Sequence, residues 1–203
     1  MELDRLTNIS SKLGDMLKAR NLSFTCAESC TGGWLSQIVT SVPGSSEWFG
    51  SSFVTYSYEA KVKMLSVSQE DLNNFGAVSE EIVKQMVVGV INKSESDVGV
   101  AITGIAGPSG GTESKPVGTV CFAWKFQDSK LVSLTEHFAG DRNQVRYSSV
   151  EKALLGTIDF IKDLSQLVAT SIITCVCFNY NAIYRQLPEM FYKYSTVTQN
   201  RHR

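Results

Sequence analysis

Apolar residues at the start of the chain recur at the spacing of one helix face. Leu3, Leu6, Ile9, Leu13 and Leu17 lie three or four residues apart. Because side chains at these intervals share one side of an α-helix, the pattern predicts an amphipathic first helix. Its apolar stripe is expected to pack on a sheet.

Short apolar runs then alternate with helical patterns along the chain. Residues 98–103 read VGVAIT, a continuous apolar run typical of a strand that is covered on both faces, so we expect it at the centre of the sheet. The alternation predicts an α/β fold, with helices on both faces of a mixed sheet in a single three-layer α/β/α domain. The predicted strands cover residues 22–27, 52–56, 98–103, 119–126 and 131–138, and the later helices cover 34–40, 59–65, 80–92 and 143–164, with a short helix between Ser68 and Gly76.

The composition changes at about residue 165. Six of the chain's 20 aromatic residues lie beyond this point. We therefore assign residues 1–164 to the domain and residues 165–203 to a divergent tail of unknown role, whose sequence fits a peripheral strand, a helix that docks on a partner, or disorder. The apolar stretch at 167–178 is shorter than the roughly 20 residues that a membrane span requires.

Overall composition narrows the possible functions. The chain has 203 residues, of which 43% are hydrophobic and 19% charged, and its formal net charge is -1. This composition excludes intrinsic disorder for most of the chain. Without a run of Lys or Arg, the sequence lacks the electrostatic footprint of a nucleic-acid-binding protein. We expect small-molecule partners and no membrane association.

The cysteines and histidines argue against a metal site. The five cysteines form no CxxC pair, and the two histidines belong to no HExxH motif, so neither a metal nor another cofactor is expected. The chain opens with acidic, amphipathic residues rather than a basic and then apolar signal. This start predicts a cytoplasmic protein with free thiols.

A polar turn with two glycines follows the first predicted strand. Ser29 lies where this strand turns into a helix, and the backbone N–H groups around Thr31, Gly32 and Gly33 are expected to face the same space. That arrangement suits a serine nucleophile beside an oxyanion hole. Alternatively, Ser29 or Thr31 caps the helix and the glycines permit close packing. Cys30 is a rival nucleophile, although no nearby histidine marks it as activated.

Lys61 is the candidate general base. It follows a predicted strand and begins a short helix, so its side chain is placed to reach back over the edge of the sheet. A partly desolvated lysine loses its proton more readily and can then accept one from a nucleophile. The alternative is a solvated helix lysine, as expected for Lys63. Ser57 lies four residues before Lys61 and is a second possible nucleophile.

A glycine-rich loop and two cations form a candidate anion site. The loop at residues 104–118 contains five glycines, so its backbone can approach a ligand and direct N–H groups at an anion. A long surface connection is the alternative. Arg142 either grips a phosphate or carboxylate or pairs with Asp141, and Lys115 has the same ambiguity. The candidate ligand-binding glycines are Gly104, Gly107, Gly110 and Gly111.

Five sequence motifs are more specific together than any single residue. They read AESCTGGWLSQIVTSVPGSSEWF, FVTYSYEAK, GAVSEE, GIAGPSGGTESKPVGTV and AGDRNQVR. In this order and spacing they resemble the CinA C-terminal domain family over residues 3–164. The resemblance implies a single-domain α/β/α fold and hydrolysis of the carboxamide of nicotinamide mononucleotide to nicotinate mononucleotide and ammonia, in pyridine nucleotide recycling. The pyrophosphatase domain of longer family members has no counterpart in the sequence, so no pyrophosphatase activity is expected.

The resemblance also implies a catalytic pair. The family is regarded as Ser/Lys amidohydrolases that need no cofactor, and the matching positions are Ser29 and Lys61. Ser29 would attack the amide carbon while neutral Lys61 accepts its proton, and an acyl-enzyme would follow. Backbone N–H groups near Gly32 and Gly33 would stabilise the oxyanion.

Further motif positions imply supporting roles. Tyr56, Thr103 and Arg142 match the family, so Tyr56 or Thr103 is expected to hold the catalytic lysine. The substrate phosphate is expected on the glycine-rich loop beside Arg142 or Lys115. Tyr58 departs from the family, which often has Asn there, so the surroundings of the lysine are expected to differ.

Two other functions remain open at this point. The first is a catalytically silent module that binds a nucleotide or a partner protein, and the second is an amidase for another small amide. The resemblance also implies a homodimer, because family members are often dimeric.

Overall fold

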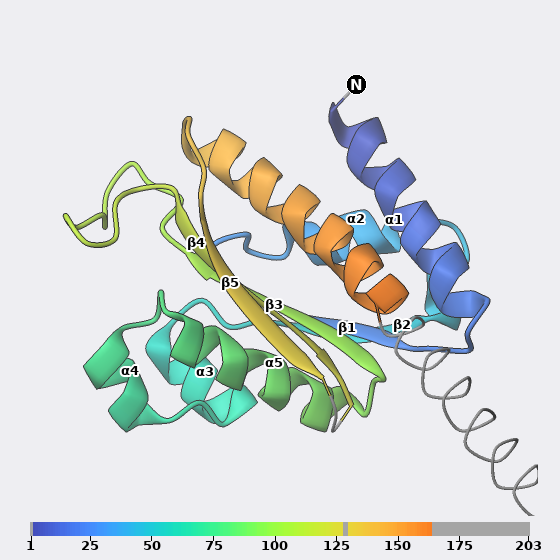
Figure 1. Cartoon of the computed structure of the whole chain (residues 1–203), viewed down its shortest axis with the longest axis horizontal. Coiled ribbons are helices and arrows are strands. Elements are labelled where there is room, and N and C mark those ends of the chain that lie inside the picture. The colour runs from blue at the N-terminus through green and yellow to red at the C-terminus, as the bar shows by residue number, and fades with distance from the viewer. Residues whose placement is uncertain (1, 128–129, 164–203) are drawn as a thin grey trace, which may run out of the picture. The chain divides into compact units, whose positions relative to one another are not determined.

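The computed structural model describes residues 2–127 and 130–163 (Figure 1). Internal contacts divide the chain into two units, Met1–Phe160 and Ile161–Arg203, and the first unit contains the whole sheet. The predicted tail at 165–203 lies outside the described residues. In chain order the elements are α1 (Glu2–Lys18), β1 (Phe24–Glu28), α2 (Trp34–Thr40), the 3-10 helix η1 (Ser45–Glu47), β2 (Phe49–Val54), α3 (Tyr58–Leu65), α4 (Gln69–Phe75), α5 (Glu80–Ser94), β3 (Val98–Gly104), β4 (Thr119–Phe126), β5 (Leu131–His137) and a last helix described over 142–163.

The five strands form one mixed sheet in the order β2-β1-β3-β4-β5. β1 runs parallel to β2 and to β3, whereas β4 runs antiparallel to β3 and to β5. β3 is therefore central, and its residues are buried until the last one. The position predicted from its continuous apolar sequence is confirmed, because only a strand covered on both faces can bury every side chain.

A row of small side chains crosses the middle of the sheet. Ala27 of β1 pairs in register with Ala101 of β3, which pairs with Ala123 of β4. All three belong to an apolar core that also contains Met86 and Val87 of α5. Because each alanine projects only a methyl group, α5 can lie close to the sheet and fill the space with its larger side chains.

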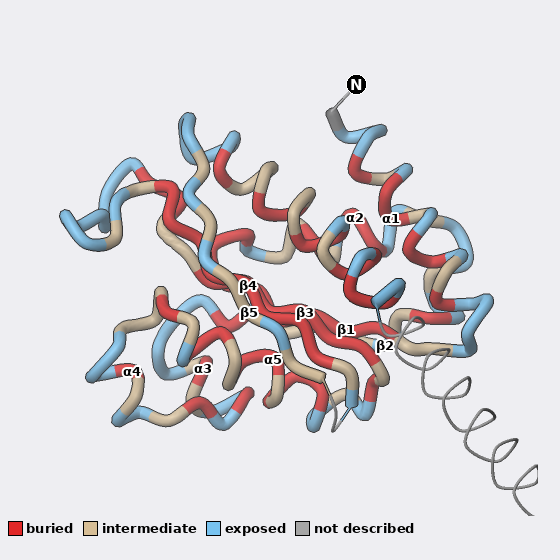
Figure 2. Tube along the Cα trace, viewed as in Figure 1, coloured by how far each residue is buried: buried red, intermediate tan, exposed pale blue. Residues whose placement is uncertain are grey.

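Helices cover both faces of the sheet (Figure 1). The last helix, α1 and α2 lie on one face, and α3, α4 and α5 lie on the other. Burial concentrates in β1, β3 and β4, between the two helical layers (Figure 2). The predicted three-layer α/β/α architecture with a mixed sheet is confirmed.

Trp124 shows how β4 and the last helix are joined. Its Nε1 donates to the carbonyl of Ala153 at 3.3 Å and to Thr157 Oγ1 at 3.1 Å. A Cβ at position 156 would lie 2.3 Å from the Trp124 ring. Gly156 is therefore required for this close contact, since a methyl group there would overlap the ring.

The carboxyl ends of β1, β2 and β3 meet at one edge of the sheet, because these strands are parallel. The chain leaves this edge through the turn at 29–33, the segment at 55–57 and the loop at 105–118. In open α/β sheets this is the edge where ligands bind. β2 begins and ends earlier than the predicted strand at 52–56. Just after it, the carbonyl of Thr55 accepts from Lys61 Nζ.

Two features are absent within residues 2–127 and 130–163. No helix there has the length and apolar character that crossing a membrane requires. No group of three or more His, Cys, Asp or Glu side chains is placed to hold a metal ion.

Candidate active site

Ser29 and Lys61 form a hydrogen-bonded pair at the carboxyl edge of the sheet. Lys61 Nζ lies 3.0 Å from Ser29 Oγ. Ser29 directly follows β1, and its N–H donates to the carbonyl of Ile102 at 3.0 Å. The backbone of Ser29 is thus fixed to the central strand. A nucleophile and its base are therefore within reach of each other, on separate elements.

The helix α3 carries Lys61 into the interior. Ser57 caps this helix, and its Oγ accepts from the N–H of Ala60 at 3.0 Å. The Lys61 side chain is 0% exposed, and its Nζ also donates to the carbonyl of Thr55 at 2.7 Å. Burial lowers the pKa of Lys61 from 10.5 to about 8. The lysine is therefore partly neutral near physiological pH, as a general base requires.

The two rival nucleophiles are placed differently. Cys30 is buried, and desolvation raises the pKa of its thiol to about 12. A thiol with such a pKa stays neutral and is a poor nucleophile. The Ser57 hydroxyl is occupied as the cap of α3. Lys63 is exposed and pairs with Glu59 at 2.6 Å, so the two lysines of α3 have opposite surroundings, as expected.

The turn after Ser29 depends on two glycines in left-handed conformations. Gly32 has φ 61° and Gly33 has φ 93°. Their N–H groups are both occupied: that of Gly32 donates to the Ser29 carbonyl at 3.0 Å, and that of Gly33 donates to Glu28 Oε2 at 3.0 Å. The expected oxyanion role of these two amides does not match this arrangement. Thr31 is fully buried, and its Oγ1 has no hydrogen-bond partner among the described residues.

A cavity of about 320 Å³ opens over the catalytic pair. It is lined by residues from the ends of β1 and β3, from α3, from the glycine-rich loop and from the start of the last helix. The structure brings together eight of the sequence-predicted residues here: Ser29, Tyr56, Lys61, Thr103, Gly104, Gly107, Gly110 and Arg142. Thr31, Gly32 and Gly33 are not among the described residues that line it.

Arg142 joins two walls of this cavity. Its Nη1 donates to the carbonyl of Gly107 at 2.7 Å, and its Nη2 donates to the Tyr56 hydroxyl at 3.0 Å. Asp141 instead caps the last helix by accepting from the N–H groups of Asn143 and Gln144. The alternative in which Arg142 merely pairs with Asp141 is therefore wrong, and the guanidinium stands at the cavity.

Neither Tyr56 nor Thr103 contacts the lysine as expected. The Tyr56 hydroxyl is bound by Arg142, and Thr103 Oγ1 donates to the carbonyl of Ala77 at 2.8 Å. The Thr55 carbonyl holds Lys61 instead. A backbone carbonyl can be supplied by any residue type, so the sequence carried no signal for this contact.

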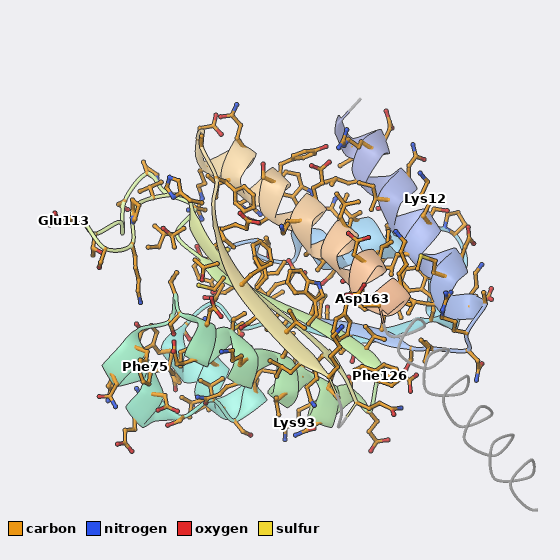
Figure 3. All side chains as sticks on the ribbon, viewed as in Figure 1. Lys12, Phe75, Lys93, Glu113, Phe126 and Asp163 are labelled. Atoms are coloured by element: carbon orange, nitrogen blue, oxygen red, sulfur yellow. The ribbon has the colours of Figure 1, made fainter. Side chains whose placement is uncertain are left out.

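Lys115 and Gly111 lie away from the catalytic pair. Lys115 Nζ donates to the carbonyl of Phe75 at 2.8 Å and lines a separate cavity of about 550 Å³ beside α4 and α5. A Cβ on Gly111 would meet the backbone nitrogen of Val117 at 2.8 Å, so this glycine serves close packing within the loop. Glu113 marks the outer tip of the same loop (Figure 3).

Three structural contributors were missed by sequence reasoning: Glu28, Thr55 and Arg146. Glu28 is fully buried and accepts hydrogen bonds from the start of α2. Arg146 donates from the last helix to the carbonyl of Thr31 at 2.7 Å. A charged residue at the end of a buried strand was an available signal for Glu28.

Comparison with known proteins now identifies the family. The sequence profile of the CinA C-terminal domain matches residues 6–161. The chain belongs to the CinA C-terminal domain family. A relative from Escherichia coli (strain K12), the nicotinamide-nucleotide amidohydrolase PncC, is 47% identical over 149 residues, which are 73% of this chain and 90% of that protein. The PncC of Enterobacter agglomerans is 43% identical over 164 residues, which are 80% of this chain and 100% of that protein.

Solved structures of CinA superfamily proteins share the fold. A CinA superfamily protein from Escherichia coli matches with a TM-score of 0.71 and 41% identity over 74% of this chain and 87% of that one. Another from Klebsiella pneumoniae 700603 matches with a TM-score of 0.75 and 33% identity over 78% of this chain and 98% of that one.

Proposed function

We propose that this protein is a nicotinamide-nucleotide amidohydrolase that converts nicotinamide mononucleotide and water into nicotinate mononucleotide and ammonia. The observation that carries the proposal is the 3.0 Å contact between Ser29 Oγ and the buried Nζ of Lys61. The names of the relatives at 43–47% identity, which the chain covers over 90–100% of their length, support the same reaction.

In the first half-reaction Ser29 Oγ attacks the amide carbon. Neutral Lys61 accepts the hydroxyl proton as the bond from Oγ to carbon forms, and the negative charge develops on the carbonyl oxygen. The resulting ammonium lies beside the negative oxygen of the tetrahedral intermediate and stabilises it in the dry interior. Lys61 then gives its proton to the leaving nitrogen, the C–N bond breaks, and ammonia departs from the acyl-enzyme.

In the second half-reaction water attacks the acyl-enzyme ester. Lys61, neutral again, takes a proton from the water as the new C–O bond forms. The ester bond to Ser29 breaks, the proton returns to Ser29 Oγ, and nicotinate mononucleotide is released. Each half-reaction uses one reversible proton transfer to the same amine, so neither a metal ion nor a cofactor enters the scheme.

The glycine-rich loop and Arg142 are proposed to bind the substrate phosphate. Gly104, Gly107 and Gly110 line the cavity beside the guanidinium of Arg142. An arginine can exchange the neutral oxygens of Gly107 and Tyr56 for charged phosphate oxygens, which form stronger hydrogen bonds. Lys115 is left out of this site, because its Nζ lies in the other cavity.

The proposal also covers the metabolic role, the compartment and the oligomeric state of the protein. The reaction would return nicotinamide mononucleotide to pyridine nucleotide synthesis, and the family resemblance supports a cytoplasmic homodimer. Measuring the molar mass of the purified protein in solution tests the dimer directly.

A second candidate is a module that binds a nucleotide or partner without chemistry. Protein YdeJ of Escherichia coli (strain K12) is 40% identical over 154 residues and carries no activity in its name. The buried lysine beside Ser29 favours the enzyme, because its lowered pKa is the property that a general base requires and a binding module does not. An amidase for another small amide would retain this pair and change the contacts of Arg142.

Ammonia release from nicotinamide mononucleotide tests the proposed activity. We expect the parent protein to release ammonia and the nucleotide acid in equal amounts, and Ser29→Ala and Lys61→Ala to lose at least about 10³-fold in kcat. Lys63→Ala is a matched control on the same helix as Lys61 and should retain activity, since its side chain is exposed and pairs with Glu59. A folded parent that binds the nucleotide and releases no ammonia would favour the binding module.

A further inference from the structure

A buried carboxylate lies directly before the nucleophile. Glu28 is the last residue of β1, and its side chain is 0% exposed. Its Oε2 accepts from the N–H groups of Gly33 at 3.0 Å and Leu35 at 3.1 Å, and its Oε1 accepts from the N–H of Ser36 at 2.9 Å. No described Lys or Arg forms an ion pair with it, so N–H dipoles and a hydroxyl satisfy the carboxylate.

This carboxylate acts as a remote cap across the nucleophile turn. The residue in the N-cap position of α2, Gly33, offers no side chain to accept the first N–H groups. An ordinary cap is the residue next to the helix. Here the acceptor is Glu28, five residues before Gly33, and the intervening residues are the turn that begins with Ser29. The hydrogen bonds of Glu28 therefore tie the two ends of the turn to each other and restrict its conformation.

A cation holds the same turn from another element. Arg146 of the last helix donates through Nη2 to the carbonyl of Thr31 at 2.7 Å. Its guanidinium lies 5.2 Å from the centre of the Trp34 ring at the start of α2, a contact that favours one orientation of the planar group. The middle of the turn is thus tied to the last helix, while its ends are tied to Glu28.

We propose that Glu28 and Arg146 are positioning residues that hold the turn at 29–33, so that Ser29 Oγ stays in contact with the base. The expected effect on the rate rests on the proposed function. Neither side chain touches the reacting atoms: Glu28 acts through the N–H groups of α2, and Arg146 acts through the carbonyl of Thr31. Burying a carboxylate without an ion pair is costly. The hydrogen bonds that Glu28 accepts in return hold the turn in one conformation.

Loss of either contact should misplace the nucleophile. In Glu28→Gln an NH₂ group replaces one carboxylate oxygen and faces N–H donors of Gly33 and Leu35 or of Ser36, so part of the cap becomes repulsive. A displacement of about 1 Å at a catalytic group can cost on the order of 100-fold in rate. Because Ser29 of this turn contacts Lys61 Nζ, displacement of the turn should admit water beside the amine and return its pKa towards 10.5.

The test combines kinetics with a measurement that needs no substrate. We expect Glu28→Gln and Arg146→Met each to lower kcat for nicotinamide mononucleotide by about 100-fold while KM changes by less than about threefold. In protein labelled with ¹³C at lysine Cε, the Lys61 signal, assigned by its loss in Lys61→Met, should titrate near pH 8 in the parent and at least about one unit higher in both variants.

Ile38→Ala is the matched control for a purely structural effect. Ile38 is a buried residue of α2 that takes no part in the hydrogen bonds of the turn, so its truncation should lower the melting temperature and leave kcat and the Lys61 titration unchanged. If folded Glu28→Gln and Arg146→Met behave like Ile38→Ala, the positioning role is overturned. If Glu28→Gln does not fold, Arg146→Met decides alone. An inactive parent whose variants still shift the Lys61 titration would refute the proposed function and leave the positioning role standing.

Discussion

Ser29 and Lys61 are 32 residues apart in the chain, yet their Oγ and Nζ lie 3.0 Å apart. Two separate anchors produce this contact: the N–H of Ser29 is bound to β3, and Lys61 Nζ is bound to the carbonyl of Thr55 after β2. Because β2 and β3 both flank β1 in parallel, the sheet brings both anchors to one edge. The contact therefore depends on the α/β/α framework as well as on the conformation of the turn that begins with Ser29.

The pH dependence of the reaction should report the lysine. Its pKa is lowered to about 8 by burial, and only the neutral amine can accept the proton of Ser29. We expect kcat/KM for nicotinamide mononucleotide to rise about tenfold per pH unit below pH 8 and to level off above it. Rates measured from pH 6 to 10 check this, with Lys63→Ala as a control that keeps the parent profile. A flat profile across pH 8 would exclude Lys61 as the base.

Replacing the base should stabilise the fold. Below pH 8 the lysine is protonated in both states, and the folded state carries the full cost of burying the charge. Between pH 8 and 10.5 the unfolded chain binds more protons, so the stability of the parent rises with pH in that window. Lys61→Met should therefore raise the free energy of unfolding at pH 7 by about 1–3 kcal/mol, and this gain should shrink by pH 10.

Urea unfolding at pH 7 and pH 10 measures that difference. The exposed Lys63→Met variant is the control and should change stability by less than about 0.5 kcal/mol at either pH. A Lys61→Met protein that is less stable than the parent at pH 7 would show that the hydrogen bonds of the amine outweigh its desolvation.

Arg142 should determine the preference for a phosphorylated substrate. We expect Arg142→Gln to raise KM for nicotinamide mononucleotide by at least about tenfold, because charge-assisted hydrogen bonds to the phosphate are lost. Nicotinamide riboside, which lacks the phosphate, should change by less than about twofold. Lys115→Gln is the comparison variant and should leave both KM values unchanged, since Lys115 lies in the other cavity. An equal loss for both substrates would remove Arg142 from phosphate recognition.

Gly89 should be required for the packing of α3 on α5. A Cβ there would lie 2.1 Å from the carbonyl oxygen of Leu65, the last residue of α3. Backbone cannot give way as a side chain can, so Gly89→Ala should destabilise the fold by about 2 kcal/mol. The melting temperature checks this against Gly50→Ala, where an added Cβ meets nothing within 4 Å. Equal stability of the two variants would contradict the observed helix contact.

The sequence predicted the framework because its signals are local. The apolar run at 98–103 marked the central strand, and the alternation of patterns gave the α/β/α layers. The short helix predicted between Ser68 and Gly76 is observed as α4, because its cap depends on a residue only three positions away: the Ser68 side chain accepts from the N–H of Asp71. Ser29 and Lys61 were selected from the motifs that resemble the CinA family, and the fold places them side by side.

The details of the site depended on contacts that no local pattern records. The depth at which Lys61 is buried, and with it the lowered pKa, arises from helices and strands packed around it. Tyr56 and Thr103 were expected to hold this lysine, but the Thr55 carbonyl does so. Lys115 lies in the same loop as the cavity glycines, yet the path of that loop carries it to the separate cavity beside α4.

What the sequence determined by itself was therefore the set of elements, their layers and the two residue types proposed for the chemistry. Only the tertiary structure decided which groups meet: Lys61 with Ser29, Arg142 with Gly107 and Tyr56, and Arg146 with a carbonyl 115 residues away. The physical reason is the distance along the sequence over which each effect acts. Periodicity and capping depend on residues only a few positions apart. Burial, pKa and the pairing of distant groups are set by how the finished layers pack.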